Sequence, residues 1–421
     1  MIGGAKMETK NHWGSSFGFI MASVGAALGL GNIWGFPYKM GENGCFAFLI
    51  FYLLFVLLAG FPVLLAEFTI GRRGGESAPH AYGKFGTFYR WAGWASIAAC
   101  MLILSYYCFF GGMVFHAVAE LLGLSWGGHV FWSIVFMALS AAIVFLGVQK
   151  GIESFSKAVI PLLILMLVFV VLHTLSSAPA RNELINLMTP RREDFNIRCA
   201  ASALVQVFFS MSLGQGCMLV CGAYQRKKGN LAAQAIFIPL FDTLTAILAA
   251  FAILPAASAQ GIDPGCGPTL LFDAVPKIFG TSKSGLIMTL LFFILVLLAA
   301  VTSVISMIET PAAALCASTG VKHSSAVLLI TVAAFILGLP VYMSYGKPLS
   351  WLNVYEFIAE YLLITLVSVA SCAAIIFGGS KQAITDIFGC DCMAGRIWIA
   401  VLKYVTPVLV TFVILSFIFS P

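Results

Sequence analysis

Eleven long apolar runs follow one another along this chain of 421 residues, and they restrict its fold more than any other feature. Each run is long enough to cross about 30 Å of hydrocarbon as a helix. Hydrophobic residues make up 61% of the sequence and charged residues only 10%. The sequence therefore predicts an all-α integral membrane protein. The runs lie at roughly 14–38, 43–71, 88–123, 129–148, 155–174, 200–224, 230–256, 284–316, 325–343, 351–378 and 396–419.

Lys and Arg are divided unevenly between alternate loops, and this bias sets the orientation of a membrane protein. One set of loops carries most of the basic residues, whereas the other mixes its fewer basic residues with acids. We therefore predict a cytoplasmic N-terminus (1–13) and, for an odd number of spans, an outward-facing Pro421. The basic set is Lys6, Lys10, Arg72, Arg73, Lys84, Arg90, Lys150, Lys157, Arg226, Lys227, Lys228, Lys322, Lys381 and Arg396.

Composition argues against several other classes of protein. The formal net charge of +6 does not indicate nucleic-acid binding, because the basic residues lie in short loops between apolar runs. The eleven Cys are scattered, as is typical of small buried hydrophobes rather than of a disulfide framework. No paired nucleophile and base is evident, so we do not expect an enzyme.

Two of the runs contain glycines where a membrane helix usually has Leu or Ile. The first run has Gly25, Gly29 and Gly31, and the sixth has Gly214 and Gly216. Gly allows the backbone to leave α geometry, and in hydrocarbon such backbone must be buried in protein or line a cavity. A break frees carbonyls that can bind a cation and exposes a helix N-terminus that can bind an anion. Close packing of helices through small residues is the alternative interpretation.

The two breaks take matching places if the chain contains two five-helix units. Interrupted helices at corresponding positions of two halves indicate a midplane site in an inverted-repeat transporter. We thus predict an extracellular loop between the units, then a cytoplasmic loop, and an eleventh helix with the C-terminus. The predicted segments are 14–174 and 200–378 for the units, 175–199 and 379–395 for the loops, and 396–421 for the last helix.

Polar residues inside other runs are further candidates for such a site. Thr302 and Ser303 offer adjacent hydroxyls that suit an alkali cation, although such hydroxyls also bond back to the carbonyl one turn earlier. Ionisable residues within membrane-spanning runs are functional candidates. Asp242 lies deepest in its run, whereas Glu67, Glu309 and Glu356 lie nearer the ends of theirs.

These residues resemble the neurotransmitter:sodium symporter family, in its bacterial branch, over nearly the whole chain. The matching segments are Trp13-Gly-Ser, Gly29-Leu-Gly-Asn-Ile-Trp-Gly-Phe-Pro-Tyr38, Glu42-Asn-Gly44, Glu67-Phe-Thr-Ile-Gly-Arg-Arg-Gly-Gly75, Ser105-Tyr-Tyr107, Phe209-Ser-Met-Ser-Leu-Gly-Gln-Gly216 and Thr302-Ser303. The resemblance implies a leucine-transporter-like 5+5 inverted repeat with broken first and sixth helices. It also implies a multi-pass protein of the bacterial inner (plasma) membrane.

The resemblance implies sodium-coupled import of an amino acid by alternating access, with two sodium ions and the lipid bilayer as partners. The first sodium would contact Ala27, Asn32, Ser210 and Asp242; the second would contact Gly25, Leu28, Ala299, Thr302 and Ser303. The substrate residues would be Ala26, Leu30, Gly31, Ile103, Tyr107, Phe209, Ser210, Ser212, Gln215, Ser303 and Met307. We expect an apolar or aromatic amino acid from Ile103, Phe209 and Met307. The sequence does not predict the oligomeric state.

The residues that would close the outer and inner ends of the transport path, the gates, differ from the family pattern. The family pairs an Arg just before Phe-Pro with an acid on the tenth helix; here Gly35 replaces the Arg, while Glu356 keeps the acid. Lys39 lies four residues after Gly35, so on a helix it would face the same side and reach Glu356. A solvated Lys is the alternative.

Gly151 and Pro161 match a family element that unwinds when the cytoplasmic side opens, and the usual inner acid is replaced by Ala317.

The residue at position 242 also affects whether transport requires chloride. Chloride-dependent relatives have Asn at this place and Ser four residues later, where this chain has Ala246. A carboxylate at 242 would supply negative charge one turn away on the same helix face. We therefore predict an ionised Asp242 and transport without chloride. A protonated Asp242 bonded to a neighbouring helix is the alternative, since burial favours the neutral form.

Two other functions stay open for a chain of this kind. A proton-coupled amino-acid transporter would have the same fold, although the Thr302 and Ser303 hydroxyls favour sodium. An amino-acid-sensing membrane receptor would use the same pocket, although no appended signalling domain is evident.

Overall fold

Helices account for almost all of the structure, which is a computed structural model. It describes residues 12–124, 126–225, 230–263, 272, 275–280, 282–345 and 350–419, with side chains up to residue 412. Those residues contain no strand, so the predicted all-α fold is confirmed. Predictions for the first eleven residues, for Arg226, Lys227 and Lys228, and for Pro421 lie outside the described residues.

The first half of the chain runs from α1 to α9 and the second half from α10 to α21. The α-helices are α1 (Ser16–Ala27), α2 (Phe36–Glu42), α3 (Cys45–Phe55), α4 (Phe61–Gly74), α5 (Ala78–Gly83), α6 (Arg90–Leu121), α7 (His129–Phe145), α8 (Ser154–Ser176), α9 (Ala178–Leu187), α10 (Ile197–Ser210), α11 (Cys217–Ala223), α12 (Leu231–Ala235), α13 (Phe237–Ala259), α14 (Val275–Phe279), α15 (Lys283–Thr319), α16 (His323–Ser344), α17 (Trp351–Glu356), α18 (Thr365–Phe377), α19 (Ser380–Phe388), α20 (Met393–Ala400) and α21 (Thr406–Phe419). The π-helical segments are η1 (Gly31–Gly35), η2 (Val56–Gly60), η4 (Val148–Glu153), η7 (Phe357–Ile364) and η8 (Val401–Val405).

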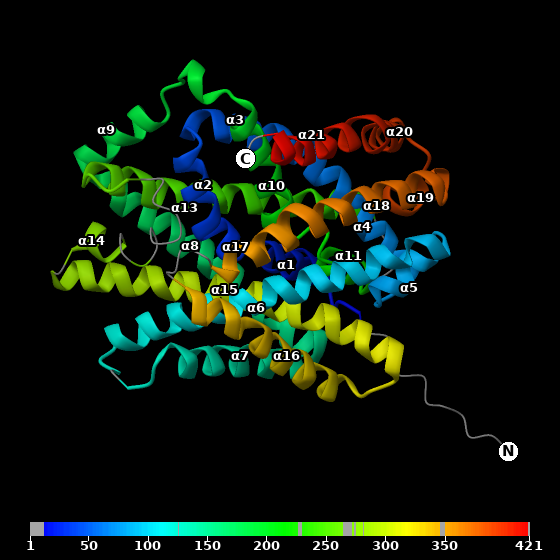
Figure 1. The fold of residues 1–421 in the computed structure, drawn as a ribbon, viewed down its shortest axis with the longest axis horizontal. Coiled ribbons are helices and arrows are strands. Elements are labelled where there is room, and N and C mark those ends of the chain that lie inside the picture. The colour runs from blue at the N-terminus through cyan, green and yellow to red at the C-terminus, as the bar shows by residue number, and fades with distance from the viewer. Residues whose placement is uncertain are drawn as a thin grey trace.

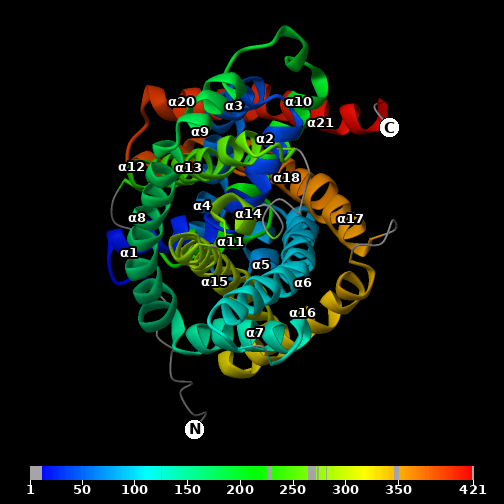
Figure 2. The ribbon, with the colours of Figure 1, turned by 90° about the vertical axis from the view of Figure 1, so that its left-hand side faces the viewer.

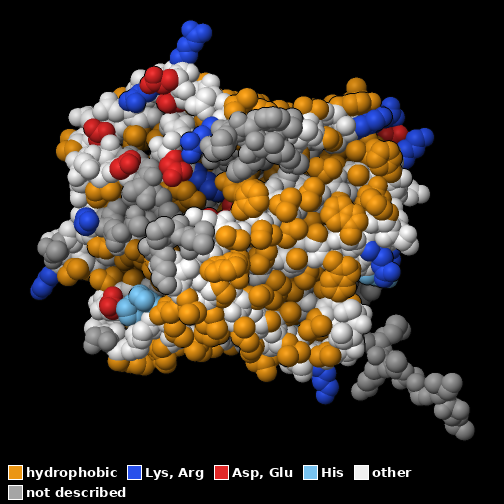
Figure 3. All heavy atoms as spheres, in the orientation of Figure 1, with side chains coloured by type: hydrophobic (Ala, Val, Ile, Leu, Met, Phe, Trp, Pro, Cys, Tyr) orange, Lys and Arg blue, Asp and Glu red, His pale blue; other side chains and the backbone are white. Residues whose placement is uncertain are grey.

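The lengths of these helices fit a membrane. Eight helical stretches of the described residues are long and apolar enough to span one, and the bent pair Ser16–Ala27 with Gly31–Glu42 makes a ninth. Two shorter apolar helices, α7 and α10, occupy the fourth and sixth predicted runs. Many helices run along the long axis of the molecule (Figure 1), with hydrophobic side chains over its middle and many charged ones toward its two ends (Figure 3). This is the arrangement of a multi-pass membrane protein.

The first helix is broken where the glycines predict it. After α1 ends at Ala27, the chain bends by 51° before it continues as η1 and α2. A Cβ on Gly29 would lie 2.9 Å from Ser303 Oγ, and one on Gly31 would lie 2.8 Å from the Phe209 ring. Both positions therefore need Gly, because the backbone here lies directly against other helices.

The sixth helix is also broken, but by a stretch of left-handed backbone. Residues 211–216 separate α10 from α11, and three of them have positive φ: Ser212 (51°), Gly214 (70°) and Gly216 (78°). A Cβ on Gly214 would lie 2.6 Å from the Ile364 carbonyl oxygen. The close-packing interpretation is thus partly correct, since glycines provide the break and also the close approach of helices.

Both breaks lie where the two halves of the chain meet. In the first half α1 packs against α13 and α15 of the second half, and α10 packs against α3 of the first. Viewed along the long axis, helices such as α7, α16 and α20 lie at the periphery (Figure 2). The bounds predicted for the repeat units stay a prediction.

Candidate functional site

A buried cluster of oxygen atoms surrounds Asp242 of α13. Asp242 is fully buried, and its Oδ1 accepts a hydrogen bond from Asn32 Nδ2 at 2.7 Å. Its Oδ2 accepts hydrogen bonds from the hydroxyls of Tyr52 at 2.9 Å and Ser210 at 3.1 Å. Four segments meet here, because Asn32 lies in η1, Tyr52 in α3 and Ser210 at the end of α10. Carboxylate and hydroxyl oxygens are hard ligands that suit an alkali cation. Asn32 turns its Nδ2 toward Asp242, and its Oδ1 accepts a hydrogen bond from the Gly29 N–H at 3.4 Å.

Three of the four residues predicted for the first sodium are thus in contact. The fourth, Ala27, is the last residue of α1 before the break. Asn32, Tyr52 and Ser210 each donate to Asp242, and an ionised carboxylate is a group that only accepts. Asp242 therefore accepts all of these bonds, and its ionised state stays a prediction. Sequence reasoning missed Tyr52, because a Tyr within an apolar run is ordinary.

A second cluster of oxygen atoms lies between α1 and α15. Thr302 Oγ1 donates to the carbonyl of Ala299 at 2.9 Å and approaches that of Leu28 at 3.3 Å. Ser303 Oγ donates to the Ala26 carbonyl at 3.4 Å. Thr302 therefore bonds back along its own helix, as the alternative interpretation required, and also contacts the broken helix.

Gly25 completes this second set of predicted residues. A Cβ on Gly25 would lie 3.4 Å from Thr302 Cβ, so the end of α1 lies directly against α15. The five residues predicted for the second sodium are therefore brought together, and all are buried. They offer carbonyl and hydroxyl oxygens, which fit a sodium ion.

The residues predicted to bind substrate gather around the two breaks. Gly31 N–H donates to the Tyr107 hydroxyl at 3.2 Å, and the rings of Tyr107 and Phe209 are 6.4 Å apart. Ser212 Oγ donates to the Ala26 carbonyl at 2.8 Å, which links the two broken helices directly. Leu30, Ile103, Phe209, Gln215, Ser303 and Met307 are also buried.

Gln215 differs from the other predicted substrate residues because its side chain has no visible partner. It is fully buried, and neither its Oε1 nor its Nε2 has a hydrogen-bond partner among the described residues. Buried amides are normally satisfied, and an unsatisfied polar group costs about 1–3 kcal/mol.

We expect Gln215→Met to raise the stability of the substrate-free protein by about 1 kcal/mol, because it replaces an unsatisfied amide with an apolar group of similar size. The apparent melting temperature without amino acid measures this. Gln206→Met is the matched control and should lower the melting temperature, because Gln206 Nε2 donates to the Gly31 carbonyl at 2.8 Å. A lower melting temperature for Gln215→Met would show that the Gln215 amide is satisfied.

The sequence matches a family model described as the sodium:neurotransmitter symporter family over residues 10–127 and 109–421. The chain belongs to this family. It is 36% identical over 355 residues to the sodium-dependent transporter YhdH of Bacillus subtilis, with 79% of each chain covered. It is 30% identical over 415 residues to a sodium-dependent transporter of Methanocaldococcus jannaschii, covering 88% of this chain and 83% of that one.

A solved structure of MhsT in complex with L-phenylalanine has the same fold. It matches with a TM-score of 0.91 and 32% sequence identity, covering 97% of this chain and 100% of that chain. These similarities identify the chain as a sodium-dependent transporter rather than an enzyme. They also confirm the predicted fold class with broken helices.

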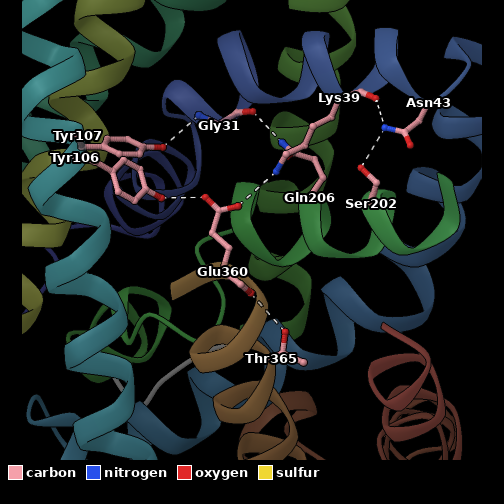
Figure 4. A network of polar contacts seen from close by, with 9 residues as sticks. All are labelled: Gly31, Lys39, Asn43, Tyr106, Tyr107, Ser202, Gln206, Glu360 and Thr365. Carbon is pink, nitrogen blue, oxygen red and sulfur yellow. Dashed lines mark hydrogen bonds and ion pairs between the residues drawn. The ribbon is translucent and has the colours of Figure 1, made fainter. Parts of the chain in front are cut away.

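The transporter carries a buried ion pair beside one of the predicted substrate residues, and this pair corrects a prediction. Lys39 Nζ lies 3.4 Å from Glu360 Oε2, and the Tyr106 hydroxyl donates to Glu360 Oε1 at 2.9 Å (Figure 4). The predicted partner was Glu356, which lies one turn earlier. The π-helix η7 begins directly after Glu356, so α-helical spacing does not apply there.

Lys39 is also not the solvated residue of the alternative interpretation. Its exposed fraction is 7%, and its Nζ lies 5.4 Å from the centre of the Phe209 ring. The ion pair therefore adjoins a predicted substrate residue, which is consistent with a gate.

Reversing the charge of Lys39 should impair transport. Lys39→Glu places a second carboxylate beside Glu360, and breaking a buried ion pair costs about 3–5 kcal/mol. Adding Glu360→Lys should restore part of the uptake rate, because the pair is re-formed in reverse. Glu356→Lys is the matched control and should restore less. Equal rescue by both second-site changes would contradict the assignment of Glu360.

The opposite end of the transporter has its own polar contacts. Glu309 accepts hydrogen bonds from the Tyr224 hydroxyl at 2.5 Å and pairs with His323 Nε2 at 2.8 Å. Sequence reasoning placed Glu309 near the end of its run but missed His323, which begins the next helix. Glu309 and Ala317, the position that lacks the usual acid, both lie on α15.

Gly151 and Pro161 lie at the start of the fifth span. Gly151 is in η4, where a Cβ would lie 2.0 Å from the Ile143 carbonyl oxygen, and Pro161 lies inside the continuous helix α8. In the same η4, Glu153 accepts the Gly14 N–H at 2.6 Å and pairs with Lys157 at 2.5 Å. The segment before α1 is therefore fastened to the fifth span. The role of Gly151 and Pro161 in opening stays a prediction.

Proposed function

We propose that this transporter imports an amino acid with an apolar or aromatic side chain, coupled to sodium, by alternating access and without chloride. The observation that carries the proposal is the pair of separate oxygen clusters at Asp242 and Thr302. Both clusters include residues of the broken first helix, and the predicted substrate residues adjoin the same break.

The substrate's charged groups suit the two breaks. Its carboxylate would bind the N–H groups at Leu30 and Gly31, at the start of a half-helix, together with the Tyr107 hydroxyl. Its ammonium group would bind carbonyls freed by the breaks, at Ala26, Phe209 and Ser210. Its side chain would lie among Ile103, Phe209, Ser212, Gln215, Ser303 and Met307. The L-phenylalanine in the MhsT complex supports an aromatic substrate.

Two sodium ions would accompany the substrate. The first would bind Ala27, Asn32, Ser210 and Asp242, and the second would bind Gly25, Leu28, Ala299, Thr302 and Ser303. The Asp242 carboxylate attracts a sodium ion 4 Å away by about 4 kcal/mol at an effective dielectric constant of 20. The Tyr52 and Ser210 hydroxyls, which could otherwise hold an anion, donate to Asp242 instead. This supports transport without chloride.

Alternating access would open the two ends in turn. Lys39 with Glu360 would close one end, and the element from Gly151 to Pro161 would open the other. The proposed location is the bacterial inner (plasma) membrane, with a cytoplasmic N-terminus and repeat units at 14–174 and 200–378.

A thermal-shift screen tests this function. The purified protein is heated with single amino acids, first in sodium and then in potassium. We expect one or more apolar or aromatic amino acids to raise the melting temperature in sodium only, because a ligand that binds the native state stabilises it. Stabilisation by no amino acid in sodium would refute the proposal.

A further inference from the structure

A cavity of about 630 Å³ lies at the end of the molecule that is formed by the end of α4, by α5 and by the start of α6. Its lining includes His12, which precedes α1, and residues at the ends of α11 and α15. It lies apart from the proposed sodium and substrate residues, none of which lines it. Lys and Arg side chains are visible toward this end, where Figure 1 places α5 and α19 (Figure 3).

The lining of this cavity is strongly basic. It contains Arg72, Arg73, Lys84 and Arg90, but a single carboxylate, that of Glu76. Asp386 of α19 offsets one further charge, because Arg73 Nε pairs with its carboxylate. Arg72 Nη1 donates to the Asp386 backbone carbonyl at 2.7 Å. A surplus of two positive charges remains.

Two buried nitrogen atoms of the lining are unused. Arg73 Nη2 and His12 Nδ1 have no hydrogen-bond partner among the described residues. The rest of the Arg73 guanidinium is fixed, because its Nε pairs with Asp386 and the group lies over the Phe85 ring at 5.7 Å. A buried guanidinium N–H without an acceptor is costly, and a phosphate oxygen is the acceptor that Arg binds best.

We propose that this cavity binds a phosphate-class anion, either free phosphate or the phosphoryl headgroup of an anionic lipid. The rule that Lys and Arg collect on the cytoplasmic side explains basic loops, but it does not explain why four basic side chains and one carboxylate line a single cavity. The walls belong to segments that are far apart in the chain, before α1 and at the ends of α4, α11 and α15. A bound anion would therefore bridge these four segments.

Binding can be measured without transport. The purified protein is kept in potassium salts, free of sodium and amino acid, and its melting temperature is followed against potassium phosphate at constant ionic strength. A parallel titration uses short-chain phosphatidylglycerol, with short-chain phosphatidylcholine as the zwitterionic control. We expect a saturable rise with phosphate, with phosphatidylglycerol or with both. A rise with phosphatidylglycerol alone identifies a lipid headgroup, and a rise with phosphate alone identifies a free anion.

The matched variants locate the site. Lys84 and Arg90 are both exposed, so Lys84→Gln with Arg90→Gln should fold normally and weaken the apparent affinity at least about tenfold. Lys381→Gln with Arg396→Gln removes the same charge from exposed positions outside the cavity and should leave the affinity unchanged. The proposal is overturned if neither phosphate nor phosphatidylglycerol gives a saturable rise in melting temperature. It is also overturned if the two double variants bind the anion with equal affinity. Neither result would affect the proposed transport function, since neither sodium nor amino acid is present.

Discussion

Replacing Thr302 and Ser303 together by Ala should reduce uptake driven by a sodium gradient to the level measured in potassium. These hydroxyls are the side-chain oxygens of the second proposed sodium site, and the other ligands are carbonyls. Thr302 Oγ1 lies 3.3 Å from the Leu28 carbonyl oxygen and Ser303 Oγ lies 3.4 Å from that of Ala26, so the double change removes two hydroxyls that join α15 to the broken helix. Uptake of labelled amino acid into proteoliposomes measures the effect.

The control uses two threonines with the same local bonding. Thr289 and Thr331 are buried and bond back to carbonyls one turn earlier, at 3.0 Å and 2.7 Å. Thr289→Ala with Thr331→Ala should therefore keep sodium-driven uptake, since neither residue lies in the cluster. Unchanged sodium dependence in the Thr302 and Ser303 double variant would show that these hydroxyls do not hold sodium.

Asp242→Asn should weaken the apparent affinity for sodium at least about tenfold, because the change removes the charge and keeps the shape. The sodium dependence of uptake gives this affinity. Asp391→Asn makes the same chemical change at an exposed carboxylate outside the site and should leave the affinity unchanged.

Chloride provides the second measurement on Asp242. Replacing chloride with gluconate should leave wild-type uptake unchanged, since the carboxylate already supplies the negative charge. Adding Ala246→Ser to Asp242→Asn should make uptake partly dependent on chloride, because a hydroxyl then stands one turn away on the same face. Collapse of wild-type uptake in gluconate would show that the Asp242 carboxylate does not replace chloride as the source of negative charge.

The broken helices and the two oxygen clusters could be predicted because their residues are unusual in a membrane. Gly29, Gly31, Gly214 and Gly216 interrupt runs that otherwise favour Leu and Ile, and a carboxylate such as Asp242 is costly in hydrocarbon. The resemblance to the family then predicted which residues of different helices share a site. The hydrophobic periodicity of each run does not predict contacts between helices.

The contacts that sequence reasoning missed depend on local geometry. Glu360 rather than Glu356 meets Lys39, because a π-helix changes the spacing of side chains and leaves no clear signal in an apolar run. Tyr52 and His323 are ordinary residues for their places, at mid-span and at a helix start. Only the packing of α3 against α10 and of α16 beside α15 gives them partners.

Uptake of a labelled amino acid into proteoliposomes under three separate gradients shows whether this transporter couples amino-acid import to sodium. The amino acid is the one that stabilises the protein most in the thermal-shift screen. We expect concentrative uptake with an inward sodium gradient, and none with an equal potassium gradient or with a proton gradient alone. Uptake driven by the proton gradient without sodium, or the absence of uptake under the sodium gradient, would contradict sodium coupling.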